Sequence, residues 1–102
     1  MTQQQRTQSQ TDAAEFWNAR FAGEEHLYGT APNAWLVSQA ARLRAGSQVL
    51  TIGDGEGRNG VWLAEQGHEV TAVDASERGL AKARALAEAR GVTVRQVLAD
   101  LT

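Results

Sequence analysis

The pattern of apolar positions along the chain predicts an alternation of strands and helices in its second half. A short apolar run at residues 49–52 is typical of a buried strand, and residues 69–74 and 92–99 form two further runs of strand type. Between them, residues 58–66 and 77–90 show helical spacing, and each of these two stretches is followed by a glycine that would end a helix. This alternation predicts an α/β fold with a parallel sheet and right-handed crossovers.

Before the first strand, the sequence predicts a tail and a helical cap segment. Residues 1–11 are almost all Gln, Thr and Ser, which bury too little apolar surface to become ordered, so we expect a disordered tail. Residues 12–46 contain two helical patterns, a short amphipathic one at the start and a second that Asn33 caps and Gly46 closes. Residues 47–102 would then form the α/β part of the chain.

A glycine-rich stretch joins the first predicted strand to the helix that follows it. Gly53, Gly55 and Gly57 stand at alternate positions, and glycine permits both a tight turn and the close approach of a ligand to bare backbone. Asp74 stands at the carboxyl end of the second strand, about 20 residues beyond the loop, where an acid can accept hydrogen bonds from both hydroxyls of a ribose. The pattern predicts a nucleotide-binding site.

The glycine spacing leaves two kinds of nucleotide open. Read from Gly55 through Gly60, it matches the G-x-G-x-x-G pattern of dinucleotide-binding folds, which would indicate NAD. Read from Gly53, it gives G-x-G-x-G with the first glycine directly after the strand. Because Glu56 and a pyrophosphate would be desolvated together, the second reading and a ligand with a cationic centre are favoured.

Four segments carry a family resemblance: Phe16-Trp-Asn-Ala-Arg20, Tyr28-Gly-Thr-Ala-Pro-Asn33, Gly53-Asp-Gly-Glu-Gly-Arg-Asn59 and Trp62-Leu-Ala-Glu-Gln-Gly-His-Glu-Val-Thr-Ala-Val-Asp-Ala-Ser76. Together they resemble the first half of a class I S-adenosylmethionine-dependent methyltransferase, in the small-molecule branch that includes tellurite-resistance and thiopurine methyltransferases. The resemblance implies half of a Rossmann-like fold, with three strands and an N-terminal helical extension. It makes residues 47–102 an S-adenosylmethionine-binding half-domain.

The resemblance also implies a set of cofactor-binding residues. They are Trp17, Arg20, Tyr28, Gly53, Asp54, Gly55, Gly57, Arg58, Asn59, Asp74, Ala75, Asp100 and Leu101. Trp17 and Arg20 would form part of a lid over the cofactor, although the aromatic residues of that helix can equally serve packing alone. Tyr28 would contact the ligand or be an exposed loop residue, and Asp100 would bind the adenine amino group.

Arg58 would stand in the first turn of a helix, where a cation opposes the helix dipole. Either Glu56 or the carboxylate of the ligand's methionine would compensate it, or the side chain is simply solvated. Thr51 stands where relatives carry an acid that helps hold the methionine end, and Asp54 stands where relatives often have a small residue or cysteine. Both positions depart from the family pattern.

No side chain in the sequence is a convincing catalytic acid or base. His26 has no partner in the sequence pattern and is expected to be solvated. Methyl transfer to a soft nucleophile needs little base assistance, because the sulfonium of the cofactor is already activated. We therefore expect a methyltransferase that acts on a small-molecule acceptor, with no catalytic residue assigned. The alternatives are a non-catalytic module that binds S-adenosylmethionine or its demethylated product, and the NAD binder above.

The composition limits the kinds of partner that the protein is expected to bind. The net charge of −2 and the scattered basic residues give no footprint for nucleic acid, and the absence of cysteine excludes disulfides and thiolate metal sites. No apolar run reaches the length of a membrane span, and the start of the chain has no apolar stretch of signal-peptide type. We expect a cytoplasmic protein without metal, nucleic-acid or membrane partners.

The three predicted strands have a consequence for assembly. In the doubly wound order the first strand lies in the middle of the full sheet, so three strands alone would leave residues 49–52 as an unpaired apolar edge. We expect two chains to pair along this edge, or to exchange elements, and so to form a homodimer.

Overall fold

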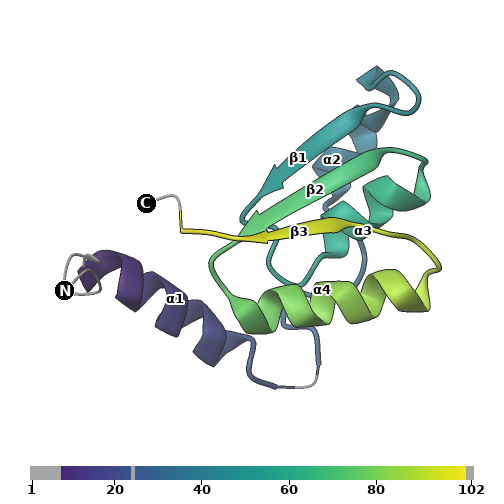
Figure 1. Cartoon of the computed structure of the whole chain (residues 1–102). Helices are drawn as coiled ribbons and strands as arrows, with labels where there is room; N and C mark the ends of the chain where they lie inside the picture. Colours follow the sequence, from purple (N-terminus) through teal and green to yellow (C-terminus); the bar gives the residue numbers. More distant parts are fainter. Residues whose placement is uncertain (1–7, 24, 101–102) are drawn as a thin grey trace.

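The computed structural model describes residues 8–23 and 25–100, which form a three-stranded parallel sheet and the helices around it (Figure 1). In chain order the elements are α1 (Gln8–Arg20), α2 (Ala34–Gln39), the short 3-10 helix η2 (Ala40–Arg42), β1 (Gln48–Ile52), α3 (Arg58–Glu65), β2 (Glu69–Asp74), α4 (Glu77–Ala89) and β3 (Arg95–Leu98). The predicted α/β class, the parallel sheet and the N-terminal helical extension are confirmed.

The strand order is β1-β2-β3, so among the described strands β1 has a neighbour on one side only. Val49 pairs with Val70 and Ala72 pairs with Gln96, which fixes a register that aligns the carboxyl ends of the strands. Leu50 and Ile52 are 59% and 64% exposed. The expectation of a buried first strand is therefore wrong, whereas the expected edge position is confirmed.

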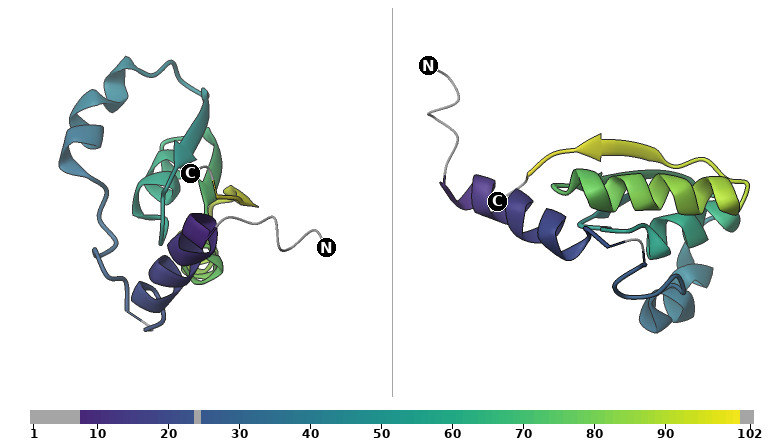
Figure 2. Two further views of the ribbon diagram at one scale, coloured as in Figure 1. Left: turned by 90° about the vertical axis from the view of Figure 1, so that its left-hand side faces the viewer. Right: turned by 90° about the horizontal axis from the view of Figure 1, so that it is seen from below.

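The hydrophobic core lies between the sheet and the two helices that follow its strands. α3 and α4 pack side by side against the same face, with α3 over β2 and α4 over β2 and β3 (Figures 1 and 2). The buried apolar side chains of this layer are Val61, Leu63, Val70, Ala72, Leu80, Ala83, Leu86 and Ala87. Leu80, Ala83 and Ala87 form the buried, sheet-facing stripe of α4, and the amphipathic spacing of that helix explains its packing.

The N-terminal helices differ from their predicted bounds. α1 begins at Gln8, within the segment expected to be a disordered tail, because Gln continues a helix readily once the following turns are formed. Asn33 caps α2 as predicted, and its Oδ1 accepts hydrogen bonds from the N–H groups of Trp35 and Leu36 at 2.9 and 3.2 Å. However, α2 ends at Gln39 instead of continuing to Gly46, since it buries no residue and short helices need packing to persist.

β3 is shorter than the predicted run of residues 92–99. Val92 and Val94 pack against the cluster of Val61, Leu86 and Ala87, and the Val92 N–H still donates to the Ala87 carbonyl at 3.0 Å. These residues therefore belong to the turn that leaves α4, and pairing with β2 starts only at Arg95. No helix in the described part of the chain is long and apolar enough to cross a membrane.

Candidate functional site

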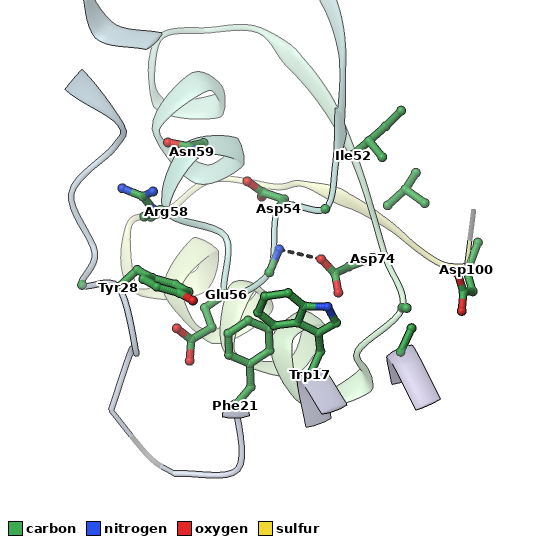
Figure 3. A pocket seen from close by; sticks show the side chains of 17 residues that line it. Trp17, Phe21, Tyr28, Ile52, Asp54, Glu56, Arg58, Asn59, Asp74 and Asp100 are labelled. Carbon is green, nitrogen blue, oxygen red and sulfur yellow. Dashed lines mark hydrogen bonds between the residues drawn. The ribbon is translucent and has the colours of Figure 1, made fainter. Parts of the chain in front are cut away.

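A cavity of about 360 Å³ opens at the carboxyl ends of the three strands (Figure 3). The cavity is lined by residues at or directly after the end of each strand. The glycine loop, the second half of α1 and the Tyr28-Gly29 segment complete the lining. Its volume falls in the roughly 300–1,000 Å³ range of small-molecule sites, and its position is the one where open α/β sheets bind ligands. The strand order and the register thus bring together most of the residues that the sequence analysis predicted for a nucleotide site.

The glycine loop needs its glycines for different reasons. Gly53, Gly55 and Gly57 have φ angles of 70°, 60° and 91°, a region that side-chain-bearing residues rarely adopt. A Cβ at Gly53 would meet nothing within 4 Å, so the bare backbone faces open space at the cavity. A Cβ at Gly57 would lie 2.5 Å from the Ala83 Cβ, and Gly57 does not line the cavity. Gly57 therefore permits close packing of the loop on α4 and does not face the site.

Asp74 points from the end of β2 towards the glycine loop, as predicted. Its Oδ2 accepts a hydrogen bond from the Gly55 N–H at 2.7 Å and its Oδ1 accepts one from the Ser76 N–H at 2.9 Å (Figure 3). A carboxylate has about four acceptor positions, so each oxygen retains one for a ligand hydroxyl. Asp74 is buried and lines the cavity, and it both fixes the loop and presents acceptors to the site.

Asp54 lies on the cavity wall beside Asp74. Its carboxylate accepts hydrogen bonds from the Gly60 N–H at 3.2 and 3.3 Å, which is possible because Gly60 has no Cβ to collide with it. Burial raises the pKa of the Asp54 carboxyl above its ordinary value, and the charge of Asp74 adds to this rise, while the Gly60 N–H and Arg58 act in the opposite direction. The site therefore holds a carboxylate whose charge is incompletely compensated.

Glu56 is not available to a cationic ligand in the way the sequence argument assumed. Its Oε2 lies 2.6 Å from the Lys82 Nζ and its Oε1 accepts a hydrogen bond from the Leu27 N–H at 2.6 Å. Of the alternatives left open for Arg58, compensation by Glu56 is wrong for the same reason. Because Lys82 neutralises Glu56, this residue is also no argument against a pyrophosphate.

Arg58 and Asn59 begin α3 and line the cavity. Among the described residues Arg58 has no salt bridge, and it is the one basic side chain on the cavity wall, so its guanidinium remains available to a ligand anion. The Asn59 Oδ1 accepts a hydrogen bond from the Asn33 N–H at 2.7 Å. Asn59 thereby ties the cap of α2 to the glycine loop.

The α1 helix supplies aromatic rings to one side of the cavity. Trp17 lines it and stacks on Phe21, with ring centroids 5.5 Å apart (Figure 3). Arg20 does not line it: its guanidinium lies 4.5 Å from the Phe16 ring centroid on the exposed side of the helix. Of the two residues predicted for a lid, only Trp17 faces the site. Tyr28 also lines the cavity and is 56% exposed.

The opposite side of the cavity is formed by strand ends. Ile52, Val73, Ala75 and Ala99 make an apolar wall, with Asp100 beside it. Ala75 and Asp100 thus lie where the sequence placed them, and Leu101 lies outside the described residues. Thr51 does not line the cavity, and its Oγ1 is buried without a hydrogen-bond partner among the described residues.

Phe21, which was not among the predicted cofactor-binding residues, also lines the cavity. Its ring fits over two glycines, since a Cβ at Gly55 or Gly79 would lie 3.1 or 3.0 Å from it. Gly79, a glycine in the first turn of an Ala-rich helix, was the sequence signal that another side chain packs closely there.

Asn18 was not predicted to have a role. Its Oδ1 accepts hydrogen bonds from the Ser76 Oγ and the Arg78 N–H, and these bonds dock α1 on α4. The Nε2 of His26, expected to be solvated, is buried.

The fold and the cavity define an α/β protein with a small-molecule-sized cavity at the carboxyl ends of its parallel strands. Comparison with known proteins narrows this class, because residues 49–102, more than half of the chain, match the family described as a methyltransferase domain. The chain belongs to this methyltransferase-domain family.

Relatives agree with the small-molecule branch inferred from the sequence. Thiopurine S-methyltransferase of Pseudomonas aeruginosa is 37% identical over 70 residues, which cover 66% of this chain and 32% of that protein. A solved structure described as concerning the conversion of a disulfide bond into a thioacetal group during echinomycin biosynthesis superposes with a TM-score of 0.73 at 30% identity, over 85% of this chain and 39% of the other. A TehB-like SAM-dependent methyltransferase from Corynebacterium glutamicum gives a TM-score of 0.55 at 28% identity, over 91% and 46%. The chain thus spans about a third of the length of the curated relatives it matches.

Proposed function

We propose that the cavity binds S-adenosylmethionine and that the chain is the cofactor-binding part of a methyltransferase for a small-molecule acceptor. The observation that carries the proposal is the charge of the cavity wall. Two carboxylates on this wall, Asp54 and Asp74, lie beside a single basic side chain, Arg58, whereas the charge of Glu56 is neutralised by Lys82. A wall with excess negative charge favours a ligand with a sulfonium and an ammonium group and opposes the pyrophosphate of a dinucleotide.

The residues present fit such a ligand. The free acceptor positions of Asp74 suit two ribose hydroxyls, and the apolar wall with Asp100 beside it suits an adenine ring and its amino group. Arg58 suits the methionine carboxylate, because it has no salt bridge with any residue that the structure describes and its own position at a helix start is unfavourable without an anion. Backbone at Gly53 and Gly55 permits close approach of the ligand.

The chemistry proposed for this site requires orientation more than acid–base catalysis. When bound, S-adenosylmethionine would supply an activated methyl group. An acceptor such as a thiolate would attack the methyl carbon in line with the C–S bond that breaks, and S-adenosylhomocysteine would leave. The residues described here would hold the adenosyl and methionine parts and so direct the methyl group. Acceptor recognition is assigned to no residue of this chain.

Calorimetric titration with S-adenosylhomocysteine tests the cofactor assignment. We expect the wild-type protein to bind and the Asp74→Asn variant to bind at least about tenfold more weakly, since hydrogen bonds to a charged group contribute roughly 1.5–3 kcal/mol each. Glu69→Gln is the matched control, because Glu69 is exposed at the other end of the same strand. Binding of NAD in place of S-adenosylhomocysteine, or equal affinities in Asp74→Asn and wild type, would refute the assignment. Transfer of the methyl group from S-adenosylmethionine to a panel of thiols then separates an enzyme from a non-catalytic binding module.

We also propose that two chains associate through β1. This strand has a described partner on one side only, and its Leu50 and Ile52 side chains are exposed, so a second copy can continue the sheet. Light scattering after size exclusion should give about twice the 11.0 kDa of one chain, and Leu50→Lys should shift it to the monomer. A monomer at high micromolar wild-type concentration would contradict this association.

A further inference from the structure

Glu56, which lines the cavity, forms a polar cluster with Lys82 and the backbone of residues 25–27, which we call the loop clamp. Lys82 Nζ lies 2.6 Å from Glu56 Oε2 and donates a hydrogen bond to the Glu25 carbonyl at 2.7 Å. Glu56 Oε1 accepts a hydrogen bond from the Leu27 N–H at 2.6 Å. The side chains of Lys82 and Glu56 are only 13% and 4% exposed, so water screens their interaction weakly.

The loop clamp connects three parts of the chain: α4, the glycine loop and the segment of residues 25–29. This segment carries Tyr28 and Gly29, which form one side of the cavity. Within the described ranges 8–23 and 25–100, the hydrogen bonds that join this segment to the rest of the domain are the two made by the loop clamp. Leu27 and Tyr28 are themselves exposed, so packing does little to hold them. The place of Tyr28 therefore depends on the loop clamp.

We propose that Glu56 and Lys82 are positioning residues, which fix residues 25–28 so that Tyr28 closes the cavity over a bound ligand. They act through the backbone of this segment: Lys82 does not line the cavity, and both carboxylate oxygens of Glu56, which does line it, are engaged by Leu27 and Lys82. The inference rests on the proposed function for what the cavity binds. A buried ion pair contributes little net stability compared with apolar residues of the same volume, so its effect lies in the geometry it imposes.

The hydrogen bonds of the loop clamp need donors at position 82 and acceptors at position 56, so exchanging the two side chains tests the proposal. Position 82 must supply donors for both the Glu25 carbonyl and Glu56, and position 56 must supply acceptors for both Lys82 and the Leu27 N–H. In the charge-swapped variant Glu56→Lys/Lys82→Glu the pair would attract as before. However, a carboxylate would then face the Glu25 carbonyl and an ammonium would face the Leu27 N–H, so the backbone would not be held.

Calorimetry with S-adenosylhomocysteine measures the effect on the site. Lys82→Met should weaken binding about tenfold if the segment then holds its closed position a tenth of the time, and the charge-swapped variant should remain as weak. Lys82→Arg, which keeps the donors, should recover most of the affinity. In a Tyr28→Ala background, Lys82→Met should change affinity less than about twofold, because both act through the same wall. The double variant Glu56→Gln/Lys82→Met leaves no lone buried charge and should bind as weakly as Lys82→Met.

Hydrogen exchange in the ligand-free protein tests the loop clamp independently of any ligand. The Leu27 amide should exchange at least about tenfold faster in Lys82→Met, as expected for loss of the contacts that keep it closed. Arg90→Met is the matched control, because it removes the more exposed Arg90–Glu65 pair of 3.0 Å and should leave Leu27 unchanged. Unchanged exchange at Leu27, or wild-type affinity in Lys82→Met or in the charge-swapped variant, would overturn the proposal. Failure of the wild-type protein to bind would instead refute the proposed function.

Discussion

The side chains around the cavity show how one residue serves the loop and the ligand site together. Asp74 uses one acceptor position of each oxygen to hold Gly55 and Ser76, and only the remaining positions face the cavity. The Asp54 carboxylate likewise accepts its hydrogen bonds from the Gly60 N–H, and its charge interacts unfavourably with that of Asp74. The glycine loop is thus shaped by the same carboxylates that are proposed to attract the cofactor.

Asp54→Asn should stabilise the ligand-free protein at neutral pH and weaken cofactor binding. The folded state raises the pKa of Asp54, chiefly through burial, so it binds more protons than the unfolded state between the ordinary pKa of Asp and the raised value. The free energy of unfolding of the wild type therefore falls as pH rises through this window, and the unfavourable contribution persists at neutral pH. Asp54→Asn does not ionise, so its free energy of unfolding does not fall in this way. Its amide oxygen can still accept a hydrogen bond from the Gly60 N–H.

Urea unfolding of both proteins from pH 3 to pH 7 checks the prediction, with Glu69→Gln as the control for removal of an exposed carboxylate. The advantage of Asp54→Asn should be absent below about pH 3.9, the ordinary pKa of Asp, and should grow above it. A constant difference over the whole range would show that the charge of Asp54 is not responsible.

Which acids and glycines lie at the site was readable from the sequence, because strand ends and loop residues have fixed places in a parallel sheet. Asp74 and Gly53 followed from this rule. The roles of Glu56 and Gly57 did not, since they depend on Lys82 and Ala83, which stand on a helix more than 20 residues further along the chain. Tertiary contacts of this kind have no signature in a single sequence.

Among the elements, the glycine loop and α4 form the tightest junction. Gly57→Ala should be strongly destabilising, because its Cβ would lie 2.8 Å from the Ala83 Cα in addition to the cost of its φ of 91°. We expect about 1–3 kcal/mol from overpacking, and about 1–2 kcal/mol from the left-handed backbone. Gly53→Ala has a similar φ of 70° but meets nothing within 4 Å, so it should show only the backbone cost.

Chemical denaturation of the two glycine variants gives the comparison, and titration with S-adenosylhomocysteine completes it. Gly53→Ala should lose affinity while remaining folded, whereas Gly57→Ala should lose stability first. Equal destabilisation by the two substitutions would show that Ala83 does not constrain the loop.

The attachment of α1 depends on Phe21. This side chain is 4% exposed and lies over Gly55 and Gly79, so Phe21→Ala should cost about 3–5 kcal/mol of unfolding free energy. Phe16→Ala on the exposed side of the same helix should cost less than about 1 kcal/mol and serves as the control. Thermal unfolding followed by tryptophan fluorescence reports both, since Trp17 stacks on Phe21. Similar losses in the two variants would contradict this anchoring role.

Element positions were predictable where packing and sequence pattern agree. β2 occupies residues 69–74 as expected. Ser76 caps α4, since its Oγ accepts a 3.0 Å hydrogen bond from the Gly79 N–H. α2 was overestimated because its apolar pattern continues beyond Gln39 although nothing in the described structure covers it. Helical spacing alone does not show whether a partner surface exists.

For the molecule as a whole, the sheet order explains both the site and the exposed edge. Parallel strands in the order β1-β2-β3 bring three carboxyl ends to one cavity, and the same order leaves β1 unpaired on its other side. The alternation of strands and helices in the sequence predicts both features. The orientation of α1 across the site did not, because it depends on the contacts of Phe21 and Asn18.

An NMR titration of the ¹⁵N-labelled protein with S-adenosylhomocysteine tests the central claim most directly. The largest amide shifts should lie in Gly53, Gly55, Asp74 and Asp100 at the carboxyl ends of the strands, with Gln48 and Glu69 at the opposite ends unaffected. Shifts confined to the opposite ends, or no shifts at millimolar ligand, would contradict an adenosyl site in this cavity.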